Sequence, residues 1–259
     1  MGDEGALTLT VLGSGTAVPS TRRGPSGFLL HVGHDHLVFD TGPGTMARLL
    51  RAGVTHDQVT HLFYSHNHLD HTGELAPFLF TSRIPASARA SRLTICGSAG
   101  FMRMFSSLLE VYGDWLAATT YPRELVTLDT GGASRLSTDS WSVQAFPVNH
   151  IESSLAYRLT HISGKTFVYT GDTDMCDDLL RVADGADLLL IEASMPDGRK
   201  IPKHLTPSEA GTIAHRAGAR KVILTHFYPP CEDVDMLEQV RDTFTGEALL
   251  AEDGLRVEI

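Results

Sequence analysis

The stretch Ser65-His66-Asn67-His68-Leu69-Asp70-His71 holds three histidines and one aspartate in six positions, directly after an apolar run over 61–64 that predicts a strand. The chain has 13 His in 259 residues, so chance is a poor explanation for this cluster. Imidazole nitrogens and carboxylate oxygens are typical ligands of zinc and similar divalent ions. The segment therefore predicts a metal site and can contribute ligands to two ions, although two ions need more ligands than it supplies. The alternative, a solvated loop without a ligand role, would crowd four titratable groups without an evident stabilising purpose.

Further candidate ligands follow later apolar runs. Runs over 141–148, 166–169 and 221–224 are followed by His150, Asp172 and His226. Strand ends are where α/β architectures gather the side chains of a site. Taken singly, each residue could equally belong to the core or support a ligand, but together and in this order they favour metal binding. Asp40, which follows an apolar run over 37–39, is expected to orient a ligand and not to be one.

Hydrophobic periodicity predicts a chain that mixes strands and helices. In the helix expected over 100–116, the residues Met104, Leu108, Val111 and Trp115 form the apolar face. A capping box at Thr206–Glu209 predicts the start of another helix. The expected strands cover 7–12, 27–32, 37–39, 61–64, 141–148, 155–162, 166–169, 187–191 and 221–224, and the expected helices cover 45–52, 73–81, 100–116 and 208–217.

The series HxHxDH, then His, Asp and His, resembles the ligand order of the metallo-β-lactamase superfamily in its dinuclear hydrolase form. The turn Asp40-Thr41-Gly42-Pro43-Gly44 also looks like an early turn of those proteins, so the likeness spans almost the whole chain. It implies an α/β (α+β) fold, a four-layer αββα sandwich in which two mixed sheets pack face to face with helices outside. Residues 1–259 are expected to form a single metallo-β-lactamase-like domain, a length that one continuous core can still serve.

The resemblance also implies roles for single residues. His66, His68 and His150 would hold one metal ion, Asp70, His71 and His226 the other, and Asp172 would bridge the two. Two such ions supply a hydroxide nucleophile at neutral pH, which implies hydrolysis, with Asp70 positioning that nucleophile. Zinc is the expected metal, and manganese and iron remain alternatives because availability decides as much as ligand type. A metal-stabilised binding module would not need such an open site.

Two further motifs resemble the ribonuclease Z branch and its phosphodiesterase relatives. His204 begins the segment His204-Leu205-Thr206, and Glu192 begins Glu192-Ala193-Ser194. In that branch such a pair acts on the scissile phosphate, and an imidazolium kept charged by a carboxylate can protonate a leaving alkoxide, so His204 is the expected general acid. The plainer alternatives are an exposed histidine before a helix and a structural carboxylate. The segment 13–20 resembles the same branch, either as a phosphate-binding loop or as a tight turn.

The size of the substrate is suggested by what the sequence lacks. Only 22 positions separate His150 from Asp172, whereas tRNA-processing ribonuclease Z typically carries a long arm in this interval that grips tRNA. The net charge of −10 also repels a polyanion at long range. We therefore expect a small phosphodiester or a short nucleic acid, with tRNA disfavoured. The alternative is a lactonase, a thioesterase or a β-lactamase-type hydrolase that uses the same metal site.

The remaining expectations concern location and assembly. The stretch Met1–Gly5 lacks the basic and apolar regions of a secretory signal, and no apolar run reaches the roughly 18 residues of a membrane span. We expect a cytoplasmic protein with no membrane partner. Cys96, Cys176 and Cys231 are too widely spaced for a metal motif and are expected to be reduced thiols. A homodimer is expected by analogy with the superfamily.

Overall fold

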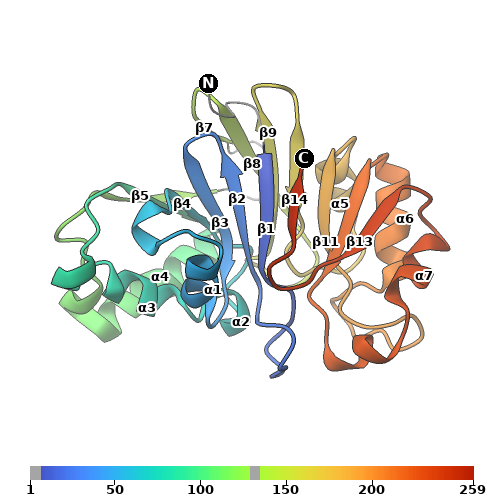
Figure 1. Cartoon of the computed structure of the whole chain (residues 1–259), viewed down its shortest axis with the longest axis horizontal. Coiled ribbons are helices and arrows are strands. Elements are labelled where there is room, and N and C mark those ends of the chain that lie inside the picture. The colour runs from blue at the N-terminus through green and yellow to red at the C-terminus, as the bar shows by residue number, and fades with distance from the viewer. Residues whose placement is uncertain (1–6, 129–134) are drawn as a thin grey trace.

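Two β-sheets pack face to face between two groups of helices (Figure 1). The computed structural model describes residues 7–128 and 135–259. The stretch Met1–Gly5, on which the expectation about a secretory signal rests, lies outside these residues. The predicted four-layer αββα sandwich is confirmed. Across the described ranges, no helix combines the length and the apolar character needed to cross a bilayer.

The first sheet has the strand order β14-β1-β2-β3-β4-β5-β6. Neighbours are antiparallel from β14 to β3 and parallel from β3 to β6. Because β3 and β4 run in the same direction, their carboxyl ends reach the same edge of the sheet. The strands are β1 (Leu7–Gly13), β2 (Gly27–Val32), β3 (Asp35–Thr41), β4 (His61–Phe63), β5 (Leu93–Gly97), β6 (Arg123–Thr127) and β14 (Arg256–Glu258).

The second sheet has the order β13-β12-β11-β10-β9-β8-β7. It is antiparallel from β7 to β10 and parallel from β10 to β13. Here too the parallel half brings several carboxyl ends to one edge. The strands are β7 (Arg135–Ser137), β8 (Trp141–Pro147), β9 (Leu155–His161), β10 (Thr166–Tyr169), β11 (Leu188–Glu192), β12 (Lys221–Thr225) and β13 (Glu247–Leu250).

Helices cover the outer face of each sheet (Figure 1). The capping box predicted at Thr206 and Glu209 is present at the start of α6. Beside the first sheet lie α1 (Thr45–Arg51), α2 (Leu69–Thr72), α3 (Leu75–Thr81) and α4 (Ala99–Tyr112), and beside the second lie α5 (Asp177–Ala183), α6 (Pro207–Ala217) and α7 (Met236–Arg241).

The prediction for α4 was wrong in its end and in its buried face. The α-helix stops at Tyr112, because Gly113 takes a φ of 55° and a short 3-10 turn follows. Its buried residues are Phe101 and Phe105, one turn apart, and the ring of Phe101 stacks on Tyr64 with centroids 4.4 Å apart. Since this pair faces the sheet, two members of the predicted apolar face, Val111 and Trp115, are 75% and 64% exposed.

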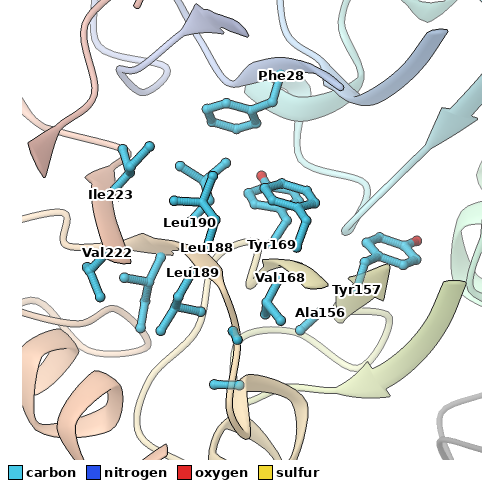
Figure 2. Packing of buried hydrophobic residues seen from close by; sticks show 14 of the residues in the cluster. Phe28, Ala156, Tyr157, Val168, Tyr169, Leu188, Leu189, Leu190, Val222 and Ile223 are labelled. Carbon is cyan, nitrogen blue, oxygen red and sulfur yellow. The ribbon is translucent and has the colours of Figure 1, made fainter. Parts of the chain in front are cut away.

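The main core lies between the two sheets. Alternation along β2 sends Phe28 into this core and Leu29 into a second cluster beneath the helices. Figure 2 shows Phe28 across from Tyr169 of β10, with ring centroids 5.0 Å apart. Phe39 of β3 stacks on Phe63 of β4 at 5.0 Å. Close packing of this kind holds the strands rigidly, and the side chains at the strand ends are held with them.

Candidate metal centre

The candidate site residues gather where strands of both sheets end. Asp40 is the penultimate residue of β3, the 65–71 segment follows β4, and Asp172 follows β10. Glu192 ends β11, and His226 follows β12. Each strand is parallel to a neighbour on its own sheet, so residues far apart in sequence arrive together.

Seven candidate ligands form two adjoining groups, and a third group that includes His204 overlaps both. His66, His68, His150 and Asp172 offer ligand atoms that all lie within 4.8 Å of one another. Asp70, His71 and His226 do the same, as do Asp172, His204 and His226. The tertiary structure thus brings together all the residues that the sequence suggested for metal binding.

Asp172 lies between the two groups. Its Oδ2 atom is 3.8 Å from His66 Nε2 and 3.9 Å from His150 Nε2 on one side. On the other side it is 3.3 Å from His71 Nε2 and 3.1 Å from His226 Nε2. One buried carboxylate oxygen that faces four imidazole nitrogens has the position expected of a group shared by two cations.

The donor set fits divalent metal ions. The Nε2 atoms of His66 and His71 are buried without a hydrogen-bond partner, a costly arrangement unless a cation completes it. Burial lowers the pKa of His66 and takes that of His226 to about 4, so both are neutral imidazoles, the form that binds metal. Burial alone would lower the pKa of His71 too, but the charges of Asp172 and Asp40 raise it. The centre therefore attracts positive charge at this point.

Hydrogen bonds at Nδ1 leave the Nε2 atoms of four histidines facing the centre. The Nδ1 atom of His66 lies 3.0 Å from Ser65 Oγ, and that of His226 lies 3.1 Å from Ser26 Oγ. The other two bonds join His71 Nδ1 to Asp40 Oδ2 at 2.7 Å and His150 Nδ1 to the carbonyl oxygen of Lys203 at 3.0 Å. Partners of this kind fix the tautomer and the ring orientation of a metal ligand.

The carboxylate of Asp40 connects several of these supporting hydrogen bonds. This buried carboxylate accepts from Ser65 N at 2.7 Å, from Ser65 Oγ at 2.6 Å and from Tyr169 OH at 2.6 Å, besides the His71 bond. The hydroxyl of Ser65 donates to Asp40, so it is free to accept from His66. One carboxylate thereby orients histidines of both groups, directly or through one hydroxyl. This geometry agrees with the supporting role expected for Asp40 from the sequence.

Backbone strain is concentrated at the same place. Within the described residues, the non-glycine positions with positive φ are Asp40 at 57°, Lys203 at 71° and His226 at 64°. Asp40 and His226 contribute side chains to the centre, and Lys203 contributes the carbonyl that fixes His150. Strained residues persist where the surrounding structure overdetermines them, which is frequent at functional sites.

Glu192 and His204 form a buried pair beside the ligands. His204 Nδ1 lies 2.9 Å from Glu192 Oε1, and the backbone N–H groups of Thr173 and Leu205 donate to the same carboxylate at 2.7 and 3.2 Å. Burial raises the pKa of Glu192 to about 7. Burial alone would lower the pKa of His204, but the hydrogen bond with Glu192 raises it. The two backbone N–H groups that donate to the carboxylate favour its ionised form, which places the proton of the pair on the imidazole.

The sequence missed several supporting residues. Ser26, Tyr169 and the carbonyl of Lys203 carry no motif, and only the fold brings them to the histidines. The 13–20 segment starts at the end of β1, where Gly13 packs on backbone. A Cβ at Gly13 would lie 1.9 Å from the carbonyl oxygen of Pro25.

Residues 36–227 match the family described as the beta-lactamase superfamily domain. The chain belongs to this family. Ribonuclease Z of Haloferax volcanii is 28% identical over 98% of this chain and 95% of its own length. The metallo-beta-lactamase fold protein YhfI of Bacillus subtilis has a TM-score of 0.84 at 24% identity, covering 98% of this chain and 100% of that one. The short form of human tRNase Z has a TM-score of 0.77 at 24% identity, with coverages of 96% and 98%.

These comparisons confirm the resemblance found in the motifs. The chain is a metal-dependent hydrolase of the metallo-β-lactamase fold and is similar to ribonuclease Z. Membership in the family implies divalent metal ions, which agrees with the His and Asp clusters. The lactonase, thioesterase or β-lactamase alternative is not favoured.

Proposed function

We propose that this protein is a phosphodiesterase that uses two divalent metal ions, with zinc as the first candidate, and that it hydrolyses small phosphodiesters or short nucleic acids. The observation that carries the proposal is the buried pair of Glu192 and His204, because a ring nitrogen of His204 lies within 4.8 Å of ligand atoms of Asp172 and His226. A proton donor beside the metal centre suits a phosphodiester, whose leaving alkoxide needs a proton. The similarity to ribonuclease Z, an enzyme named for RNA cleavage, supports the same class of bond.

We assign one ion to His66, His68 and His150, the other to Asp70, His71 and His226, and a bridging position to Asp172. When bound, such ions act as Lewis acids toward a phosphoryl group and lower the pKa of water. Asp70 is the residue we expect to position the attacking water and accept its proton. His204 donates a proton from Nε2 to the leaving oxygen, since its Nδ1 is engaged by Glu192. Glu192 keeps the imidazole charged and oriented.

A small substrate is supported by the short path between His150 and Asp172. The strands β9 and β10 fill most of this interval as an antiparallel pair. The alignment with the Haloferax volcanii ribonuclease Z extends over 309 positions, more than the 259 residues of this chain. That relative therefore has insertions that this chain lacks. Together with the net charge of −10, this makes tRNA the less favoured substrate.

The test is hydrolysis of bis(p-nitrophenyl) phosphate beside a lactone and a β-lactam, with metal content measured for each preparation. His204→Ala should retain its metal and lose about 10² to 10⁴ in diesterase kcat, the usual weight of a general acid. Asp172→Ala should lose metal and activity together. His215→Ala, which changes an exposed histidine of α6, is the control and should behave as wild type. Turnover of the lactone or β-lactam that is indifferent to His204 would refute the proposal.

We also propose that residues 1–259 form one domain and that the protein works in the cytoplasm. A third proposal is that two copies assemble into a homodimer. Light scattering coupled to size-exclusion chromatography tests the last of these, because a constant mass near 28.1 kDa at all concentrations would contradict it.

A further inference from the structure

A cavity of about 650 Å³ lies beside the loops that carry His66, His68 and His150. The loops that carry candidate ligands form part of its wall, because Asn67 lies between His66 and His68, and Ile151 follows His150. The first turns of α4 form another part of the wall. The volume lies within the range of small-molecule sites. A substrate held at the metal centre can therefore extend into this cavity.

The lining suits a polar ligand with one flat or apolar part. Met104 and Ile151 supply apolar surface, and both are partly buried. The polar side chains that line the cavity are Asn67, Ser98, Arg103, Ser107, Glu152 and Ser153. A nucleotide combines these needs, since it has a base, sugar hydroxyls and phosphates.

Arg103 has a free guanidinium in this wall. Its side chain is exposed and makes no hydrogen bond or ion pair with any residue in the described part of the chain. The two lysines of the segment before His204 are engaged, in contrast. The Nζ atom of Lys203 donates to Asn149 Oδ1 at 2.6 Å, and that of Lys200 bonds Asp174 and Glu209, both at 2.6 Å. In a chain with net charge −10, an unpaired arginine facing a cavity is well suited to an anionic ligand.

We infer that Arg103 binds a second phosphate of the substrate, on the part that extends from the scissile phosphodiester toward α4. The inference rests on the proposed phosphodiesterase function and specifies its substrate class, a nucleotide ester that carries an additional phosphate. The planar guanidinium is matched to a phosphate through two parallel hydrogen bonds. Glu152, in the same cavity, repels the phosphate and accepts from a sugar hydroxyl or a base amino group, so the two side chains set the orientation of the ligand.

The experiment compares two chromogenic esters, the p-nitrophenyl ester of thymidine 5′-phosphate with and without a 3′-phosphate, at constant ionic strength. Wild type should show a kcat/KM about 10- to 100-fold higher for the 3′-phosphorylated ester, the scale of a hydrogen bond to a charged group. Arg103→Ala should remove this preference by raising KM, with kcat for the plain ester unchanged, and Arg103→Lys should restore part of it. Arg216→Ala, at the exposed end of α6 on the other flank (Figure 1), is the matched control.

Calorimetric binding of thymidine 3′,5′-bisphosphate and thymidine 5′-phosphate to the metal-loaded protein gives a second readout. The bisphosphate should bind about 10-fold or more tightly than the monophosphate, and Arg103→Ala should abolish the difference. If both esters are hydrolysed equally by wild type and Arg103→Ala, the inference is overturned while the phosphodiesterase proposal stands. If neither ester is hydrolysed but the bisphosphate preference depends on Arg103, the proposed function fails and the phosphate site stands. Equal binding of the two nucleotides overturns the inference in either case.

Discussion

Replacing Asp40 by asparagine isolates the electrostatic role of the Asp40 carboxylate, which orients the candidate ligand histidines. Asparagine tolerates the left-handed backbone that Asp40 adopts at a φ of 57°, so the substitution adds little strain. It has nearly the same volume, and the buried position therefore stays filled. What changes is hydrogen bonding, because one of the two carboxylate oxygens becomes an NH₂ group that can only donate.

Neither orientation of the new amide satisfies the site. With the NH₂ group in the Oδ1 position, it meets the backbone N–H of Ser65, which now donates to Asp40 at 2.7 Å. In the Oδ2 position it meets Ser65 Oγ, Tyr169 OH and His71 Nδ1, at 2.6, 2.6 and 2.7 Å. The two hydroxyls can rotate, but the imidazole can accept only by moving its proton to Nε2, the atom that faces the metal centre.

The size of the expected effect follows from these two orientations of the amide. A buried donor left without an acceptor costs about 1–3 kcal/mol, and loss of the negative charge weakens the remaining bonds. We expect Asp40→Asn to lower the free energy of unfolding of the metal-free protein by about 2–4 kcal/mol, which corresponds to roughly 4–16 °C in Tm. Metal affinity should fall about 10- to 100-fold, as for other groups that orient ligands.

The assays are urea unfolding of the metal-free protein, followed by intrinsic fluorescence, and competition for metal against a chromogenic chelator. Asp139→Asn changes an exposed carboxylate and serves as the control. The reasoning is refuted if Asp40→Asn keeps the stability of wild type within about 0.5 kcal/mol and also keeps its metal affinity.

Three further substitutions test two supports of the fold and one support of the centre. Asp253→Ala removes the carboxylate that holds the 14–24 turn, with bonds of 2.8–3.0 Å, and should cost about 1–3 kcal/mol in the unfolding free energy; an unchanged urea midpoint would contradict this. Arg89→Met leaves four backbone carbonyls, in one buried and three partly buried bonds, without their donor, so a loss of about 3–5 kcal/mol is expected in the same assay, and a loss below about 1 kcal/mol would show that water replaces the guanidinium. Ser26→Ala frees Nδ1 of His226 and should weaken one of the metal-binding steps about 10-fold in a chelator titration, whereas equal weakening of all steps would mean a general loss of structure.

Local sequence patterns predicted much of the architecture. The boundaries of β2 and β10 coincide with the predicted runs, and the capping box of α6 lies where Thr206 and Glu209 predicted it. The strands β6 and β7 were missed because their residues are mostly exposed or half-buried and lack a clear apolar period. The strand β14 is only three residues long and is defined by its pairing with β1. The face of α4 was misjudged because the stacking of Phe101 on Tyr64, not the summed periodicity, decides which side is buried.

The sequence by itself was enough to predict which residues bind metal. The 66–71 segment needs no tertiary information to be recognised, since its ligands lie within one loop and their chemistry is local. The order of His150, Asp172 and His226 after apolar runs added the rest through the superfamily resemblance.

Only the tertiary structure decided how those residues are held. Ser26, Asp40 and Tyr169 reach the histidines because two packed sheets bring distant strand ends to one edge, and no spacing along the chain encodes those distances. The same holds for Arg103, which is an ordinary exposed residue of a helix in the sequence. It becomes a candidate for phosphate binding only because α4 packs beside the ligand loops and leaves a cavity between them.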